Sequence, residues 1–247
     1  MTILEAAALV LAGIGAGLFG GIAGLASIIS YPALLAVGLG PVSANVTNTV
    51  ALVFSGLGST LGSRPELRSQ RHRVRALATV GLLGGLVGAG LLVLTPSGAF
   101  AKVVPILIGL SSLAVLSPRP KAHPAGLSKD RPAVVVGVFA ISVYGGYFGA
   151  AAGVLLLALL LATTAETLPQ SNAIKNLVLW LANLSAAVIF ALVSSVHWLY
   201  VLPLAVGFFI GGLTAPRVVR RLPAGPLRIV IAVAGLAIAI KLAGQAY

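Results

Sequence analysis

The chain has 247 residues, of which 59% are hydrophobic and only 8% are charged, and it carries a formal net charge of +12. A soluble domain is usually about 25% charged, so these values, with a mean hydropathy of +1.10, argue against an ordinary soluble domain and favour a membrane protein. The sequence contains no cysteine, which excludes disulfides, cysteine-based metal sites and a thiol nucleophile.

Ten apolar segments follow one another along the chain, and we expect all of them to be helical because lipid offers no partner to an open strand edge. Pro32, Pro105 and Pro203 fall within these segments and are expected to kink or begin helices. The sequence therefore predicts an all-α, polytopic membrane protein. The ten segments lie at about 3–20, 22–39, 44–62, 76–94, 101–116, 132–148, 149–163, 172–194, 198–215 and 227–245.

Most of the positive charge lies in three short loops between these segments, which hold 13 of the 16 Lys and Arg residues. Basic loops of this kind face the cytoplasm under the positive-inside rule. Threading the segments places all three loops on that side and both termini outside. Aromatic residues do not alternate with these arginines, so nucleic acid is not expected as a partner. The basic residues of the three loops are Arg64, Arg68, Arg71, Arg73 and Arg75, then Arg119, Lys121, Lys129 and Arg131, and then Arg217, Arg220, Arg221 and Arg228.

The second half of the sequence repeats features of the first half at offsets of 125 to 128 residues. GLFGGIAG resembles VYGGYFGA, and SANVTNTV resembles SNAIKNLV. Each half holds five segments, and this odd number makes the second half enter the membrane from the opposite face, as in the inverted repeats of secondary transporters. A chance likeness between glycine-rich helices is the alternative. We expect a first repeat at 1–117, a basic cytoplasmic loop at 118–131 and a second repeat at 132–247.

Two pairs of neighbouring segments are short, and each pair is joined at a double glycine. Each pair predicts either two thin spans or a re-entrant hairpin that turns near the middle of the membrane. Such a turn exposes backbone amides and a helix N-terminus, both of which favour an anion. Close helix packing is the alternative role for these glycines. They are Gly20, Gly21 and Gly24 in the first half and Gly145, Gly146 and Gly149 in the second.

The stretch SNAIKN places a lysine at the start of a long apolar run. With Ser171 or Asn172 as the N-cap, Lys175 falls in the first turn, where a cation opposes the helix dipole unless an anion binds there. Lys175 and Asn176 would then form a cationic cup of hydrogen-bond donors suited to one oxyanion. The alternative is a lysine that stretches its ammonium group to the membrane surface. The polar residues at the matching place in the first half are Asn45, Thr47 and Asn48.

Catalytic and metal-binding arrangements are not expected. The only aspartate, Asp130, falls in an inside loop whereas His197 falls outside, so the chain offers no Ser–His–Asp triad. The three histidines and four acidic residues never cluster along the sequence, so we expect no metal and no cofactor. The chain is therefore not expected to be an enzyme.

Two long stretches resemble the sulfite exporter TauE/SafE family of membrane proteins. GGIAGLASIISYPALLAVGLGPVSANVTNTVALVFSGLGS resembles its N-terminal motif, and GGYFGAAAGVLLLALLLA followed by NAIKNLVLWLANLSAAVIFAL resembles its C-terminal half. Family members often carry a glycine run after the first double glycine, where this chain has Leu25–Ala26–Ser27 and, in the second half, Ala150–Ala151–Ala152. Matched by position, the resemblance implies a substrate site at Gly20, Gly21, Gly24, Asn45, Thr47, Asn48, Gly145, Gly146, Gly149, Asn172, Lys175 and Asn176.

The resemblance implies a bacterial inner-membrane permease that moves sulfite, sulfoacetate or related organosulfonates, mostly outward. We expect an anion site between the two repeats and transport by alternating access, with a small anion and the lipid bilayer as partners and a homodimer left open. An anion channel and a non-transporting membrane scaffold are the alternatives. A carrier, unlike a channel, shows trans-stimulation in counterflow experiments.

Overall fold

The computed structural model describes residues 1–68, 71–116, 132–164 and 166–219, with a few further residues between 233 and 244. All regular structure in these ranges is helical, which confirms the all-α prediction. The helices are α1 (Ile3–Ala23), α2 (Ala26–Ala36), α3 (Pro41–Gly62), α4 (Arg64–Arg68), α5 (Arg71–Leu94), α6 (Ser97–Leu116), α7 (Pro132–Tyr147), α8 (Ala152–Thr163), α9 (Leu168–Val193) and α10 (Trp198–Val219).

Four of these helices contain segments long and apolar enough to cross a membrane, namely Ile3–Ala23, Val74–Leu94, Leu168–Val193 and Trp198–Val219. By contrast, α2 has 11 residues and α8 has 12. At 1.5 Å per residue they reach only about 16–18 Å, which is less than a hydrocarbon core of roughly 30 Å. The apolar segment expected at 227–245 falls largely outside the described residues.

Local sequence signals explain the starts of three helices. Thr2 and Glu5 form a capping box at the start of α1, in which the amide of Glu5 donates to Thr2 Oγ1 at 3.1 Å and the amide of Thr2 donates to Glu5 Oε2 at 2.7 Å. Pro41 begins α3, where its missing amide removes no helical hydrogen bond. The start expected for α9 at residue 172 is wrong, because a capping box of Thr167 and Gln170 begins this helix at Leu168.

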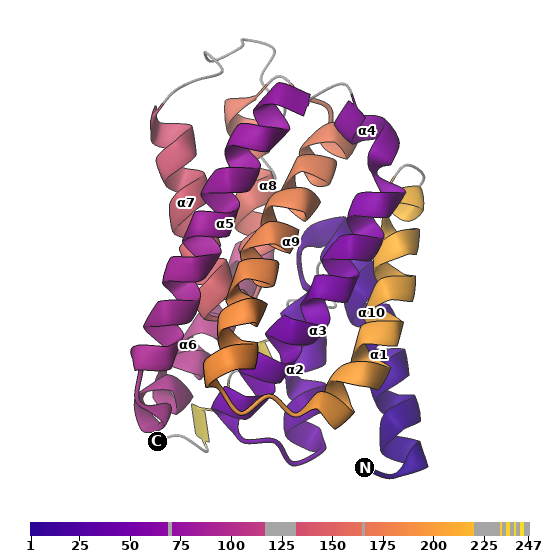
Figure 1. Ribbon diagram of the computed structural model, residues 1–247, viewed down its shortest axis with the longest axis vertical. Helices are drawn as coiled ribbons and strands as arrows, with labels where there is room; N and C mark the ends of the chain where they lie inside the picture. The colour runs from indigo at the N-terminus through magenta and orange to yellow at the C-terminus, as the bar shows by residue number, and fades with distance from the viewer. Residues whose placement is uncertain are drawn as a thin grey trace.

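The long helices pack as two groups of three. In one group α10 packs against α1 and α3, and in the other α5 packs against α7 and α9. Figure 1 shows α5 and α7 at one side of the bundle and α1 and α10 at the other, with α9 and α3 between them. The contact between α3 and α9 joins the groups. Each of α5 and α10 therefore packs mainly against helices from the opposite half of the sequence.

Glycines allow the close approach of helices within each group. A Cβ on Gly13 would lie 2.6 Å from the carbonyl oxygen of Leu204, so α1 and α10 touch backbone to backbone. In the other group a Cβ on Gly88 of α5 would overlap the carbonyl oxygen of Val143 on α7. Small residues have this role in membrane helix packing, where apolar lipid provides little hydrophobic drive for association.

The outer face of the bundle is apolar, as expected for a protein that lipid surrounds. Leu83 and Val87 of α5 are exposed, as are Leu202 and Val206 of α10. The basic residues that the structure describes with side chains lie mostly at the helix ends, including Arg68 at the end of α4. The described helices thus have the charge and polarity distribution of a multi-pass membrane protein.

Candidate functional site

Two helical pairs, α1 with α2 and α7 with α8, are each interrupted by a break near the centre of the bundle. Between α1 and α2 the chain turns at Gly24, whose φ is 77°, and between α7 and α8 it turns at Gly149, whose φ is 74°. Both values lie in the left-handed region that favours glycine. The two breaks touch, because a Cβ on either Gly24 or Gly153 would overlap the backbone of the other residue. The double-glycine segments of the two halves therefore meet in space.

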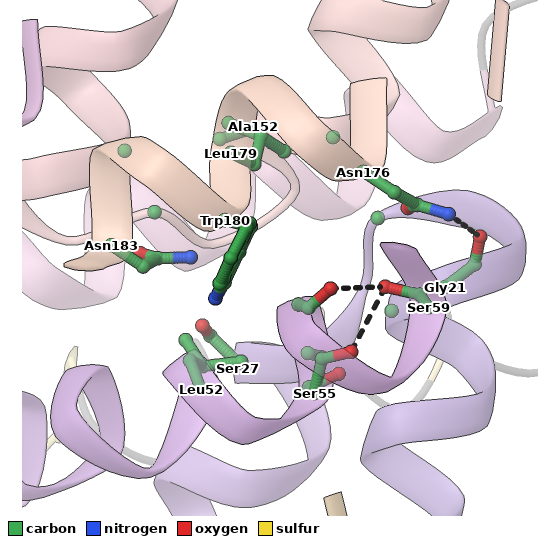
Figure 2. Close-up of a pocket in the computed structure, with 17 residues that line it drawn as sticks. Gly21, Ser27, Leu52, Ser55, Ser59, Ala152, Asn176, Leu179, Trp180 and Asn183 are labelled. Atoms are coloured by element: carbon green, nitrogen blue, oxygen red, sulfur yellow. Dashed lines mark hydrogen bonds between the residues drawn. The ribbon is translucent and has the colours of Figure 1, made fainter. Parts of the chain in front are cut away.

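A cavity of about 60 Å³ lies beside this contact. Figure 2 shows polar side chains of α3 and α9 around it, together with residues from the two breaks. Among the residues that the structure describes, its wall contains no acidic and no basic side chain. The lining residues are Gly20, Gly21, Gly24, Ala26, Ser27, Leu52, Ser55, Gly56, Ser59, Gly145, Gly149, Ala152, Gly153, Asn176, Leu179, Trp180 and Asn183.

The N-termini of both short helices lie at this cavity. Ala26 and Ser27 begin α2, and Ala152 and Gly153 begin α8, and all four residues line the wall. Neither N-cap residue makes a side-chain hydrogen bond to its helix. The first amides of a helix have no intrahelical partner, and its N-terminus carries partial positive charge. The two N-termini thus contribute positive potential to the cavity, and none of its described wall residues carries a charged side chain.

Side-chain donors add to these backbone groups. Nε1 of Trp180 is buried and has no hydrogen-bond partner among the described residues. Figure 2 shows this nitrogen pointing toward Ser27 and Leu52, with Asn183 on the same side of the cavity. The Ser27 hydroxyl accepts a hydrogen bond from Asn48 Nδ2 at 3.2 Å and keeps its own proton to donate. An oxyanion here would find neutral donors on several sides.

Lys175 lies behind the cavity wall rather than in it. Its side chain is fully buried, and Nζ donates to the carbonyl oxygens of Gly20 and Gly21, both at 3.2 Å. Both carbonyls belong to the last turns of α1, where the helix dipole is negative. Because α9 begins at Leu168, Lys175 is not in the first turn of its helix, and the prediction of an N-cap at Ser171 or Asn172 is wrong.

Two neighbouring asparagines on α9 assist the lysine. Nδ2 of Asn172 donates to the Gly21 carbonyl at 2.9 Å, and Nδ2 of Asn176 donates to the same oxygen at 3.3 Å. A reciprocal bond joins the other pair of helices, because Nδ2 of Asn45 on α3 donates to the Tyr147 carbonyl at the end of α7 at 2.9 Å. The long central helix α9 therefore hydrogen-bonds to the end of α1, and α3 does the same to the end of α7, in each case across the two halves of the sequence.

The structure brings six of the twelve predicted site residues to the cavity wall, namely Gly20, Gly21, Gly24, Gly145, Gly149 and Asn176. The other six lie outside it. Gly146 packs against Gly85 of α5, and Thr47 Oγ1 accepts from the amide of His197 at 3.1 Å. Asn45, Asn48, Asn172 and Lys175 are buried and make the contacts described above. A role for Lys175 in binding the anion stays a prediction.

Several lining residues are not among those predicted from the sequence. Trp180 and Asn183 follow the predicted Asn176 at spacings of four and three residues, which places all three on one face of α9. Ser55 and Ser59 are likewise one turn apart on α3. Polar residues at helical spacing inside an apolar run were a signal that could have located both faces.

A family model described as sulfite exporter TauE/SafE matches residues 9–242 of the chain. No curated protein and no solved structure matches it. The family comprises membrane transporters of sulfur-containing anions rather than enzymes, and the apolar helices are what such a transporter needs to cross the bilayer. Because the match extends over nearly the whole sequence, this chain belongs to the sulfite exporter TauE/SafE family.

Proposed function

We propose that the chain is a carrier that moves sulfite or a short organosulfonate across the bacterial inner membrane by alternating access. One observation carries this proposal: the N-termini of α2 and α8 lie at a single cavity, and its described wall residues offer hydroxyl, amide and indole groups and no acidic side chain. Half-helix N-termini that meet inside a membrane are a recurrent means of binding anionic groups in secondary transporters.

The size of the cavity favours a small anion. A volume of about 60 Å³ corresponds to room for a few water molecules, since one water needs about 10–15 Å³ on this measure. A sulfite ion, with one sulfur and three oxygen atoms, has a volume of this order. Leu52, Leu179 and Trp180 supply an apolar part of the wall, against which the carbon atoms of a short sulfonate would pack if the cavity widened.

A bound anion would offset the positive charge of the buried Lys175 side chain. Lys175 lies one residue before the lining residue Asn176, and its Nζ contacts carbonyls of the lining residues Gly20 and Gly21. In a medium of low dielectric constant its charge acts over such distances with little screening. We propose that Lys175 attracts the anion electrostatically and leaves the direct hydrogen bonds to neutral donors.

The moving parts follow from the packing. In Figure 1, α1, α3 and α10 rise from the end that holds the N-terminus, whereas α5, α7 and α9 run the opposite way. These directions support an inverted repeat in which the third long helix of each half, α5 or α10, packs with the opposite half. We propose that α1, α3 and α10 rock as one body against α5, α7 and α9, about the contact between α3 and α9.

The direction of transport follows from charge. We propose that the end of the bundle that carries Arg64, Arg68 and Arg217 faces the cytoplasm and that both termini face outward. An anion that leaves a negative-inside cell gains about 2.3 kcal/mol per charge per 100 mV. The membrane potential would then suffice to drive export.

Counterflow into proteoliposomes tests the proposal. Vesicles loaded with unlabelled sulfite should take up radiolabelled sulfite transiently above equilibrium, and a membrane potential without a pH gradient should sustain net flux. Flux without trans-stimulation would indicate a channel instead. Equal rates in vesicles with and without the protein, measured with sulfite and with sulfoacetate, would leave only the scaffold alternative. Light scattering of the purified protein would show whether the carrier is a homodimer.

A further inference from the structure

A second and larger pocket lies where α3, α4 and α5 meet. Its volume is about 430 Å³, several times that of the cavity between the helix breaks. In Figure 1 this region lies at the end of the bundle opposite the N-terminus. Its lining residues are Thr60, Arg64, Leu67, Arg68, Val74 and Arg75.

The rim of this pocket is strongly cationic. Arg64 and Arg68 come from α4 and Arg75 comes from α5, and all three side chains are exposed. None of the described lining residues carries a carboxylate. Glu66 lies on α4 between Arg64 and Arg68, but it is not among the lining residues of the pocket. Three like charges repel one another, and an anion between them would relieve that repulsion.

A buried polar atom adds an independent indication of a ligand. Thr60 Oγ1 is buried and has no hydrogen-bond partner among the described residues. The hydroxyl of the preceding residue, Ser59, instead donates to the carbonyl oxygen of Ser55 at 2.9 Å. An unsatisfied buried hydroxyl costs free energy, and a ligand oxygen in the pocket would provide the missing partner.

The remaining lining favours a ligand that is partly apolar. Leu67 is half-buried and Val74 is buried, and both contribute carbon atoms to the pocket. Further along α5, Leu82 and Leu86 are exposed on the outer surface of the bundle, where lipid would contact them. The pocket therefore has charge at its rim, an apolar lining and a lipid-facing helix beside it.

We propose that this pocket binds a phosphate group, carried by the headgroup of an anionic phospholipid or by a soluble phosphate ester. Arginine forms paired hydrogen bonds with phosphate oxygens, which lysine cannot match in geometry. Basic residues next to membrane helices bind anionic headgroups for the same reason. The Thr60 hydroxyl donates to one further phosphate oxygen, and Leu67 and Val74 pack against the carbon atoms that bear the phosphate.

The test compares the purified full-length protein with three variants. The triple variant Arg64→Gln, Arg68→Gln, Arg75→Gln removes the rim charges, and Thr60→Val removes the hydroxyl while keeping the side-chain shape. Arg217→Gln is the matched control, because this exposed arginine lies on α10, outside the pocket. Native mass spectrometry and thermal unfolding report binding of phosphatidylglycerol, phosphatidylcholine, glycerol 3-phosphate and inorganic phosphate.

We expect the wild-type protein to retain phosphatidylglycerol in preference to phosphatidylcholine, with binding at least about tenfold weaker in the triple variant. Thr60→Val should weaken binding severalfold, and Arg217→Gln should leave it unchanged. Stronger protection by phosphatidylglycerol identifies the lipid as the source, and equal protection by glycerol 3-phosphate identifies a soluble ester. The proposal is overturned if no phosphate compound stabilises the wild type, or if Arg217→Gln weakens binding as much as the triple variant.

Discussion

Nζ of Lys175 lies 3.2 Å from the carbonyl oxygen of Gly21, a residue that lies 154 positions earlier in the chain. The side chain is fully buried, and its charge meets the negative end of α1. The lysine thus neutralises a helix end that would otherwise repel an anion, while the positive ends of α2 and α8 lie at the cavity. This relationship makes the charge, rather than the shape, of residue 175 the property to test.

Lys175→Met should fold and lose transport. The Gly21 carbonyl keeps its bonds from Asn172 and Asn176, and the Gly20 carbonyl keeps the amide of Gly24 at 2.7 Å, so the substitution leaves neither oxygen unsatisfied. Removal of a buried charge also removes its desolvation cost. We expect a thermal midpoint within a few degrees of wild type and sulfite flux in proteoliposomes reduced at least about tenfold.

Lys102→Met is the control, because this lysine is exposed near the start of α6 and its replacement removes the same charge from the chain. It should keep wild-type flux. Wild-type flux in Lys175→Met, with the variant correctly inserted, would show that the lysine has only a structural role and would end its assignment to anion attraction.

Gly24→Ala should disrupt the contact between the two breaks. Its φ of 77° costs an alanine about 1–2 kcal/mol, and the new Cβ would overlap the backbone of Gly153. We expect a loss of at least about 2 kcal/mol in stability and no measurable flux. Gly15→Ala on the same α1 is the control, because its Cβ has no atom within 4 Å, and it should unfold no earlier than wild type. Equal thermal midpoints in the two variants would contradict the close approach of the breaks.

The sequence predicted the helices well because the bilayer imposes a simple rule on them. Every backbone polar group must be satisfied within the segment, so apolar runs bounded by proline, glycine or arginine define helices such as α5 and α10 with small errors at their ends. The start of α9 was missed because the apolar run begins after the helix does. Thr167 and Gln170 form its capping box in a polar stretch that lies between the expected apolar segments.

The composition of the site was harder to predict because it depends on contacts between distant segments. The double glycines indicated where the helix breaks lie. Five of the six predicted glycines line the cavity, and so does the predicted Asn176. The partners of Lys175 are carbonyls of α1, which no local spacing in α9 reveals. Likewise, helix periodicity gives no information about which neighbour a helix packs against, so the exchange of α5 and α10 between the two groups was not foreseen.

Gly88→Ala should separate α5 from α7 and so weaken one of the two proposed rocking bodies. A Cβ at this position would overlap the carbonyl oxygen of Val143 and lie 2.8 Å from the amide nitrogen of Tyr147. We expect overpacking to lower the free energy of unfolding by about 1–3 kcal/mol. Gly90→Ala, two residues away on α5, meets nothing within 4 Å and should raise helix stability by up to about 1 kcal/mol.

Thermal unfolding in detergent distinguishes these two alanine variants directly. Opposite shifts of the thermal midpoint are the expected result. If both variants shift the midpoint in the same direction by the same amount, α5 does not approach α7 as closely as the packing indicates, and the grouping of α5 with α7 and α9 loses its support.

Trp180→Phe should weaken anion binding without unfolding the protein. The indole ring packs over Gly56, where a Cβ would lie 2.5 Å from the ring, and phenylalanine keeps an aromatic ring at this place. What is lost is Nε1, a buried donor without a partner among the described residues. A hydrogen bond to a charged group is worth about 1.5–3 kcal/mol, so the KM for sulfite should rise about tenfold or more while the maximal rate changes little.

Trp198→Phe is the control, because the Trp198 side chain is 55% exposed at the start of α10, and this variant should leave the KM unchanged. An unaltered KM in Trp180→Phe would mean that the transported anion does not reach this face of α9, and the cavity between the helix breaks would no longer be its binding site.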